Sequence, residues 1–186
     1  LNPSDSHNIR HHSNPKNFMF RSYDSYNDFG GHYIFYDAKS YRVPNKEFNI
    51  EEQKGAKRIA FIGDSMTQAV QHPWKDSFVG IVQKRFPNIV VRNFGTGSYS
   101  PLLYLVLLKR DVKEFKPTDV IIQLYANDMG NDEYYYKFTN SKNINEINSV
   151  SAQKFWIIKY YRYSYLLRFL RKVQQNIKVK LKTLFP

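Results

Sequence analysis

Three short apolar stretches recur along the middle of the chain, each bounded by charged or turn-forming residues. They cover residues 58–63, 89–94 and 120–125, and they are rich in Ile, Val and Phe. Runs that are apolar at consecutive positions are typical of strands buried on both faces of a parallel sheet. We therefore expect three parallel β-strands.

Two amphipathic stretches separate these strands. Residues 76–86 and 101–116 carry apolar residues at helical spacing, and a proline follows each of them. Ser100 is placed as the N-cap of the second helix, with Pro101 in its first turn. Strands that alternate with helices predict right-handed crossovers. The expected fold class is therefore α/β, a three-layer sandwich with a parallel sheet at its centre.

The flanking regions differ in composition from this core. Residues 1–56 form a polar, aromatic-rich leader, for which we expect an extended path with one or two short strands. Residues 57–140 form the α/β core. Residues 141–186 begin as an Asn-rich connection and continue as a basic amphipathic segment, expected to form one long helix or two short ones. The apolar positions of that segment are Ile158, Tyr161, Tyr165, Phe169, Val173 and Ile177.

The formal net charge of +12 is concentrated near the end of the chain. Residues 151–186 hold nine of the 28 Lys and Arg residues and none of the 16 Asp and Glu residues. A basic, aromatic segment of this kind fits a membrane surface or an anionic polymer, which we expect to be contacted through residues 152–182. Two alternatives stay open: a helix that packs its aromatic face while its charges remain solvated, and a coding bias toward Lys, Asn and Tyr. The segment contains no motif that is typical of base recognition, so no specific nucleic-acid partner is expected.

Cysteine is absent, which excludes disulfides, thiolate nucleophiles and Cys-based metal sites. His11 and His12 are adjacent in the leader, where we expect them to face solvent rather than to hold a metal. We therefore assign no metal and no cofactor. The longest apolar run, residues 102–108, is shorter than the ~18 residues that a membrane helix needs.

Polar residues follow each of the three predicted strands. The loops contain Gly63-Asp64-Ser65, then Asn93-Phe94-Gly95, then Asn127-Asp128. Because ligands bind at the carboxyl ends of parallel strands, we expect the three loops to converge on one crevice. A serine there could attack an acyl carbon while backbone and carboxamide N–H groups stabilise the developing oxyanion.

A purely structural role for the same residues stays open. Ser65 could cap the following helix, Gly95 could serve a tight turn and Asn127 could close an Asx-turn. Asn131 is an alternative to Asn127 as a carboxamide donor.

The three loop sequences resemble a known family. FIGDSMT, NFGTGSYS and YANDMGND, in this order within residues 57–132, resemble the first three blocks of the SGNH hydrolases, also called GDSL esterases and lipases. The resemblance implies a flavodoxin-like sandwich and an acyl ester hydrolase or acyltransferase. It also implies small-molecule or carbohydrate O-acyl esters as substrates and a location in the bacterial cell envelope or outside the cytoplasm.

The resemblance also implies the roles of single residues. Ser65 would be the nucleophile, and its own amide, Gly95 and Asn127 would form the oxyanion hole. Asp64 and Asp128 would organise their loops.

One part of the family pattern is missing. The family's general base is a histidine in a fourth block, Asp-x-x-His, and this sequence holds no histidine after its third strand. We expect the chain to be a fragment that lacks this block and to leave an apolar sheet edge uncovered. In the alternative, another histidine is recruited, and His72, seven positions after Ser65, is the candidate. A further alternative is a non-catalytic binding module that uses its basic helix on a membrane or an anionic glycan.

Overall fold

The computed structural model describes residues 5–7, 9–23, 31–53, 57–126, 128–152, 166 and 169. The chain divides into two units, residues 1–152 and 153–186, and every element below belongs to the first unit. Of the second unit, Leu166 and Phe169 are described, and both are helical. Most of the basic segment predicted to be helical therefore lies outside the described residues.

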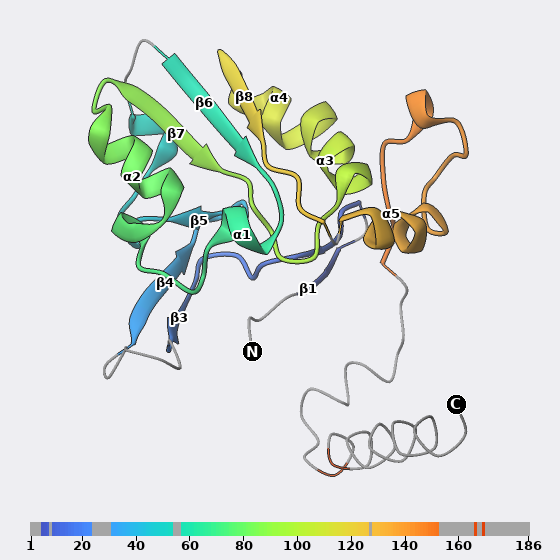
Figure 1. Ribbon diagram of the computed structural model, residues 1–186, viewed down its shortest axis with the longest axis horizontal. Coiled ribbons are helices and arrows are strands. Elements are labelled where there is room, and N and C mark those ends of the chain that lie inside the picture. The colour runs from blue at the N-terminus through green and yellow to red at the C-terminus, as the bar shows by residue number, and fades with distance from the viewer. Residues whose placement is uncertain are drawn as a thin grey trace. The chain divides into compact units, whose positions relative to one another are not determined.

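A three-stranded parallel sheet forms the centre of the first unit (Figure 1). Its strand order is β7 (Ile89–Asn93), β6 (Lys57–Ile62) and β8 (Asp119–Ile122). Phe61 of the middle strand pairs with Asn93 on one side and Ile121 on the other. The three predicted parallel strands are confirmed, although the third ends three residues earlier than expected.

Helices cover both faces of the sheet, so the α/β class is also confirmed (Figure 1). Alternate residues of a strand point to opposite faces. Phe61 and Val91 accordingly pack with Val79 of α2 (Phe78–Arg85). Ala60 and Ile62 belong to the larger cluster, which includes the apolar face of α3 (Pro101–Leu107). Each large apolar side chain buried in this way contributes about 1.5–3 kcal/mol to folding.

The two predicted helices differ in detail from expectation. The first begins at Phe78 rather than Asp76, because Ser77 Oγ accepts the Gly80 amide as an N-cap (3.2 Å). A 3₁₀ turn, Trp74–Asp76, precedes it. The second is interrupted after α3 by a π turn, Leu108–Val112, and ends as α4 (Lys113–Phe115).

Ser100 occupies the N-cap position of α3, but its hydroxyl does not cap the helix. The hydroxyl donates to Asp132, whose Oδ1 also accepts the Leu102 amide (2.9 Å). Asp132 lies on α5 (Asp128–Tyr136), which follows β8. The capping carboxylate therefore comes from a later helix, and only tertiary packing brings it there.

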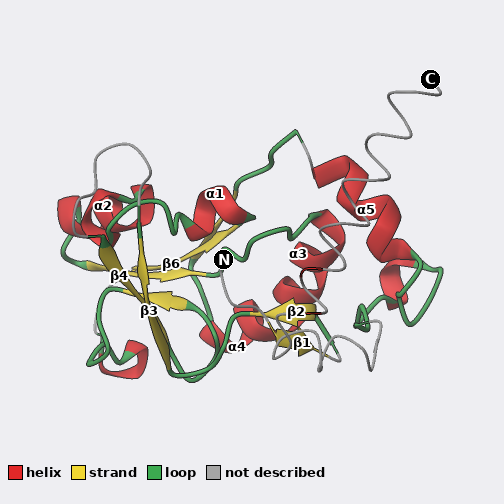
Figure 2. Ribbon diagram, turned by 90° about the horizontal axis from the view of Figure 1, so that it is seen from below, coloured by secondary structure: helices red, strands yellow, loops and turns green. Residues whose placement is uncertain are grey.

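The leader contains more regular structure than predicted. Instead of one or two strands, its described residues form five. β1 (Asp5–His7) pairs with β2 (His11–Ser13), and β3 (Phe18–Ser22), β4 (His32–Tyr36) and β5 (Arg42–Val43) form an antiparallel sheet. The aromatic residues of the leader are irregularly spaced and do not show the alternation that predicts a strand, so the sequence did not indicate these strands. Figure 2 shows β3 beside β4 and β1 beside β2, in agreement with their antiparallel pairing.

Leader side chains belong to the main core. Tyr41 and Ile50 are buried in the cluster that covers the α3 face of the sheet, and the Tyr41 and Phe94 ring centroids lie 4.7 Å apart. Ile50 opens a short 3₁₀ turn, Ile50–Glu52, and a second such turn spans Ile144–Glu146.

The edge strand β8 is apolar and exposed. Val120 and Ile122 point to the α3 face and Ile121 to the α2 face, and all three remain exposed in the part of the chain that the structure describes. None of the described helices is both long and apolar enough to cross a bilayer.

Candidate active site at the strand ends

Ser65 lies where the middle strand of the sheet ends and a short helix, α1 (Ser65–Gln68), begins. The N-cap of this helix is Asp64, which is buried and accepts the Met66 amide through Oδ1 (2.8 Å). Ser65 Oγ is half-buried and donates to Asp64 Oδ2 over 3.4 Å, a long contact. Helix capping therefore does not occupy the Ser65 hydroxyl.

Gly95 follows β7 and lies directly against α1. A Cβ at this position would lie 2.4 Å from the Gln68 amide nitrogen and 2.6 Å from the Thr67 carbonyl carbon. Only glycine permits this approach. Thr67 and Gln68 belong to the same four-residue helix as Ser65. Because each helical residue rises about 1.5 Å, Gly95 lies within one helical turn of Ser65. The first and second predicted loops therefore meet.

The amide of Gly95 already has an acceptor in this structure. It donates to Asn93 Oδ1 (2.8 Å), while Asn93 Nδ2 donates to the Thr67 carbonyl (2.8 Å). Asn93 thus fastens the loop to α1. A substrate oxygen could use the Gly95 amide only by sharing it with Asn93 or replacing Asn93 as its acceptor.

Gly97 also faces the serine, a feature that the sequence analysis missed. A Cβ at Gly97 would lie 3.9 Å from Ser65 Cβ and 3.2 Å from Gln68 Oε1. The Gly97 amide donates to Gln68 Oε1 (3.1 Å), and its carbonyl accepts from His12 Nε2 (2.7 Å). Gly97 belongs to the same NFGTGSYS stretch as Gly95, which was the available signal.

Gln68 joins the leader to this loop. Its buried carboxamide donates to Asn14 Oδ1 (2.7 Å) and to the Tyr36 hydroxyl (2.8 Å), while it accepts from Gly97. A buried carboxamide that uses both its donors and its acceptor holds its neighbours in one arrangement. The leader therefore helps to set the loop that faces Ser65, which no local sequence pattern indicates.

The third loop is described in part. Asn127, the predicted carboxamide donor, lies outside the described residues, and its alternative, Asn131, lies within α5. Asp128 is buried at the start of that helix, where Oδ2 accepts from the Tyr125 amide (3.0 Å) and from the Tyr104 hydroxyl (3.2 Å).

Tyr104 lies within electrostatic reach of both the first and the third loop. Burial, followed by the nearby carboxylates of Asp128 and Asp64, raises the pKa of the Tyr104 phenol. Tyr104 therefore stays protonated at neutral pH and remains a donor to Asp128.

The histidines do not complete a serine–histidine pair. Within the described part of the chain, no histidine ring hydrogen-bonds to Ser65 Oγ. His72 is exposed in the turn after α1, and its carbonyl accepts from Arg42 (2.6 Å). His7 accepts two backbone amides through Nδ1, and His32 contacts the Val70 carbonyl.

The expectation that His11 and His12 face solvent is wrong. Both rings are half-buried, because they pack against the aromatic rings of Tyr99 and Tyr135, with centroid distances of 5.0 Å for His12–Tyr99 and 4.9 Å for His11–Tyr135. Burial, together with the neighbouring His12, lowers the pKa of His11 to about 4. Among the described residues, no group of three or more His, Asp or Glu side chains could hold a metal ion.

Comparison with known proteins adds no family assignment, since no family model and no curated protein matches this chain.

Proposed function

We propose that this chain is an SGNH-type domain, flavodoxin-like in its sheet, and that Ser65 is the nucleophile of an acyl ester hydrolase or acyltransferase. The observation that carries the proposal is the position of Ser65. Its hydroxyl stands at the end of the central strand, free of the capping role that Asp64 fills, and its Cβ lies close to Gly97 in the loop that also holds Gly95.

The proposed reaction is acyl transfer through a covalent intermediate. Ser65 Oγ attacks the carbonyl carbon of an ester and loses its proton, and the alcohol leaves with a proton as the ester bond breaks. Water or a sugar hydroxyl then takes the acyl group and regenerates the serine. Carbohydrate O-acyl esters are the proposed substrate class, following the family resemblance.

Charge develops on the carbonyl oxygen, and N–H donors around Ser65 would stabilise it. The Ser65 amide, the Gly95 amide and the Asn127 carboxamide are the proposed donors. Loss of one such donor typically costs about 2.7–4 kcal/mol of transition-state stabilisation.

The described contacts supply Ser65 with a weak proton acceptor. Asp64 Oδ2 is 3.4 Å away, and a carboxylate is a poorer base than a histidine near neutral pH. General-base assistance is typically worth about 10²- to 10⁴-fold. We therefore expect slow turnover by these 186 residues, with Ser65 still open to reagents that acylate or phosphonylate it once.

The second candidate is a non-catalytic binding module with the same crevice. It is favoured by one observation, that no described histidine hydrogen-bonds to Ser65. The basic segment through which such a module would bind a membrane or an anionic glycan lies mostly outside the described residues.

Labelling with a fluorophosphonate, followed by mass-spectrometric mapping, separates the two functions. The hydrolase predicts an adduct on Ser65 that is lost in Ser65→Ala and kept in Ser98→Ala, a matched control at an exposed serine of the neighbouring loop. Thermal unfolding of both variants shows whether they are folded. A folded wild-type chain that takes no label supports the binding module.

A further inference from the structure

A second concave site lies on the leader, in a pocket of about 360 Å³. Residues of β3, β4 and the segments 37–39 and 46–51 form its walls, and Arg92 of β7 reaches it from the central sheet. A volume of this order suits a small molecule or part of a polymer. We call it the leader pocket.

Apolar side chains that are open to solvent line part of the leader pocket. Phe18 is 38% exposed and Met19 is 51% exposed. Met19 pairs with Phe35 on one face of the β3–β4 sheet, and Phe18, which pairs with Tyr36, points to the other face. The Phe18 ring stacks on Phe20 with 6.3 Å between centroids. Exposed apolar side chains at the edge of a concave site favour binding there. Flat, rigid rings suit the flat C–H faces of sugar rings, with little conformational entropy to lose.

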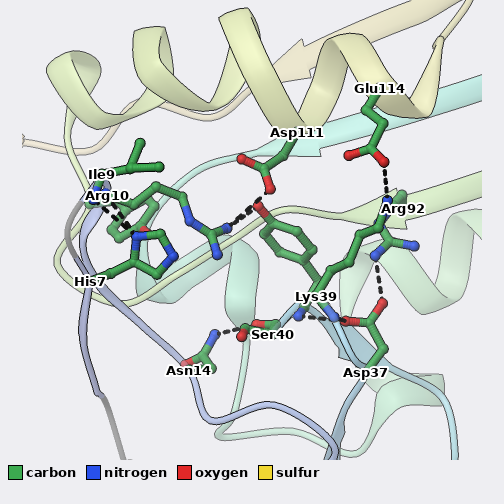
Figure 3. Close-up of polar contacts among 12 residues, drawn as sticks. His7, Ile9, Arg10, Asn14, Asp37, Lys39, Ser40, Arg92, Asp111 and Glu114 are labelled. Carbon is green, nitrogen blue, oxygen red and sulfur yellow. Dashed lines mark hydrogen bonds and ion pairs between the residues drawn. The ribbon is translucent and has the colours of Figure 1, made fainter. Parts of the chain in front are cut away.

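Another part of the pocket is polar, and its side chains are held by hydrogen bonds. Arg92 is buried and forms an ion pair with Asp37 Oδ2 (2.5 Å), and Asp37 Oδ1 accepts the Lys39 and Tyr41 amides (2.9 Å each). Figure 3 shows Arg92, Asp37 and Lys39 converging in this way. Because hydrogen bonds fix the positions of these polar groups, they can bind sugar hydroxyls without first being ordered. Asn17 and Asn49 also line the pocket.

Charge decides between a neutral and an anionic ligand. Three cations line the pocket, and each has a carboxylate beside it: Arg92 with Asp37 (2.5 Å), Lys39 with Glu114 (2.7 Å) and Lys46 with Glu47 (3.5 Å). Two of these pairs are visible in Figure 3. A nucleic acid or another polyanion binds mainly through uncompensated cations. The compensated charges therefore favour an uncharged ligand, although the whole chain is basic.

We infer that the leader pocket binds a neutral glycan, with sugar rings stacked on Phe18 and hydroxyl groups bonded to the Asp37–Arg92 end. The inference goes beyond the proposed acyl chemistry, because none of its contacts uses Ser65. A glycan held here would be a partner or a carrier of substrate, whichever reaction Ser65 performs.

The test is a titration of the full chain with two neutral probes, the hexasaccharides of glucose and of N-acetylglucosamine, followed by NMR amide shifts. We expect shifts at residues 17–19, 35–39 and 46–51, and little change in affinity between about 0.05 and 0.3 M salt. Phe18→Ala should weaken binding at least about tenfold. The matched control Phe86→Ala, an exposed ring outside the pocket, should stay within about twofold of wild type.

Three outcomes would overturn the inference. The first is no shift with either probe up to about 10 mM, a concentration that detects even weak binding. The second is stronger, salt-dependent binding of a single-stranded oligothymidine on the same residues, which would assign the pocket to nucleic acid. The third is neutral-probe shifts confined to the Ser65 loops. Ser65→Ala should bind the probes like wild type, so failure of the acyl chemistry and failure of glycan binding are seen separately.

Discussion

His12 Nε2 donates a hydrogen bond to the carbonyl oxygen of Gly97 over 2.7 Å, across 85 positions of the sequence. A carbonyl oxygen can only accept, so the proton of a neutral His12 ring is on Nε2 and its Nδ1 is an acceptor. The leader thus holds the loop that faces Ser65 by one specific tautomer of one ring.

This relationship predicts the behaviour of His12 variants. His12→Ala leaves the Gly97 carbonyl without its donor, which costs about 1–3 kcal/mol if the group stays buried. We expect faster amide hydrogen exchange in residues 94–100, measured by mass spectrometry. His12→Gln can still donate from its Nε2 and should restore most of the protection. Equal exchange in the wild type and in His12→Ala would show that His12 does not hold the loop.

The His11–His12 pair also predicts how stability depends on pH. His11 Nδ1 lies 3.1 Å from His12 Nδ1 and must donate to it, which leaves His11 Nε2 unprotonated, buried and without a partner among the described residues. Burial lowers the pKa of His11 to about 4 and also lowers the pKa of His12, on which Arg10 acts in the same direction. Tyr134, Tyr135 and Phe138 are the rings that face His11.

The sign follows from the two states. The unfolded chain takes up a proton on His11 near pH 6.5, whereas the folded chain resists protonation until about pH 4. The free energy of unfolding is therefore unaffected by the titration of His11 above pH 6.5. As the pH falls from 6.5 to about 4, protonation of His11 in the unfolded chain lowers the free energy of unfolding progressively. Urea unfolding at several pH values measures it. His11→Asn, which tolerates the positive φ of 55° at this position, should flatten the profile between these limits. An unchanged slope in the variant would assign the dependence to other groups.

Two glycines give opposite predictions for substitution by alanine. Gly95→Ala places a Cβ 2.4 Å from the Gln68 amide nitrogen, so we expect a loss of about 1–3 kcal/mol or more from overpacking. Gly130→Ala, within α5, meets no atom within 4 Å and should stabilise the fold by up to about 1 kcal/mol. Denaturant unfolding compares the two. A Gly95→Ala variant as stable as Gly130→Ala would mean that the loop does not approach α1 closely.

Local patterns predicted the central sheet well. The strands β6 and β7 were recognisable because consecutive apolar residues are typical of strands that are covered on both faces. The strand β8 carries the same apolar pattern, although its side chains are exposed in the described part of the chain. Gly95 was recognisable because it follows such a strand in a short turn. The roles proposed for Ser65, Asn127 and the SGNH family stay predictions, since they rest on a resemblance of three short motifs.

The leader could not be predicted in the same way. Arg42 is a fully buried cation, and its guanidinium donates to the carbonyls of Gln68 (2.8 Å), Ala69 and His72 (2.6 Å), which close the end of α1. Burial lowers the pKa of Arg42 to about 10. A charged residue in a polar, aromatic stretch gives no signal that it will be buried against a helix that begins more than twenty positions later.

The sequence by itself determined the α/β core and the order in which its loops reach one edge, because strand and helix periodicity are properties of neighbouring residues. Only the tertiary structure decided that His12 holds Gly97, that Asp132 caps α3 and that the leader forms a pocket around Asp37 and Arg92. Each of these contacts joins groups far apart in the chain, and its partner is chosen by the packing of whole elements rather than by local preference.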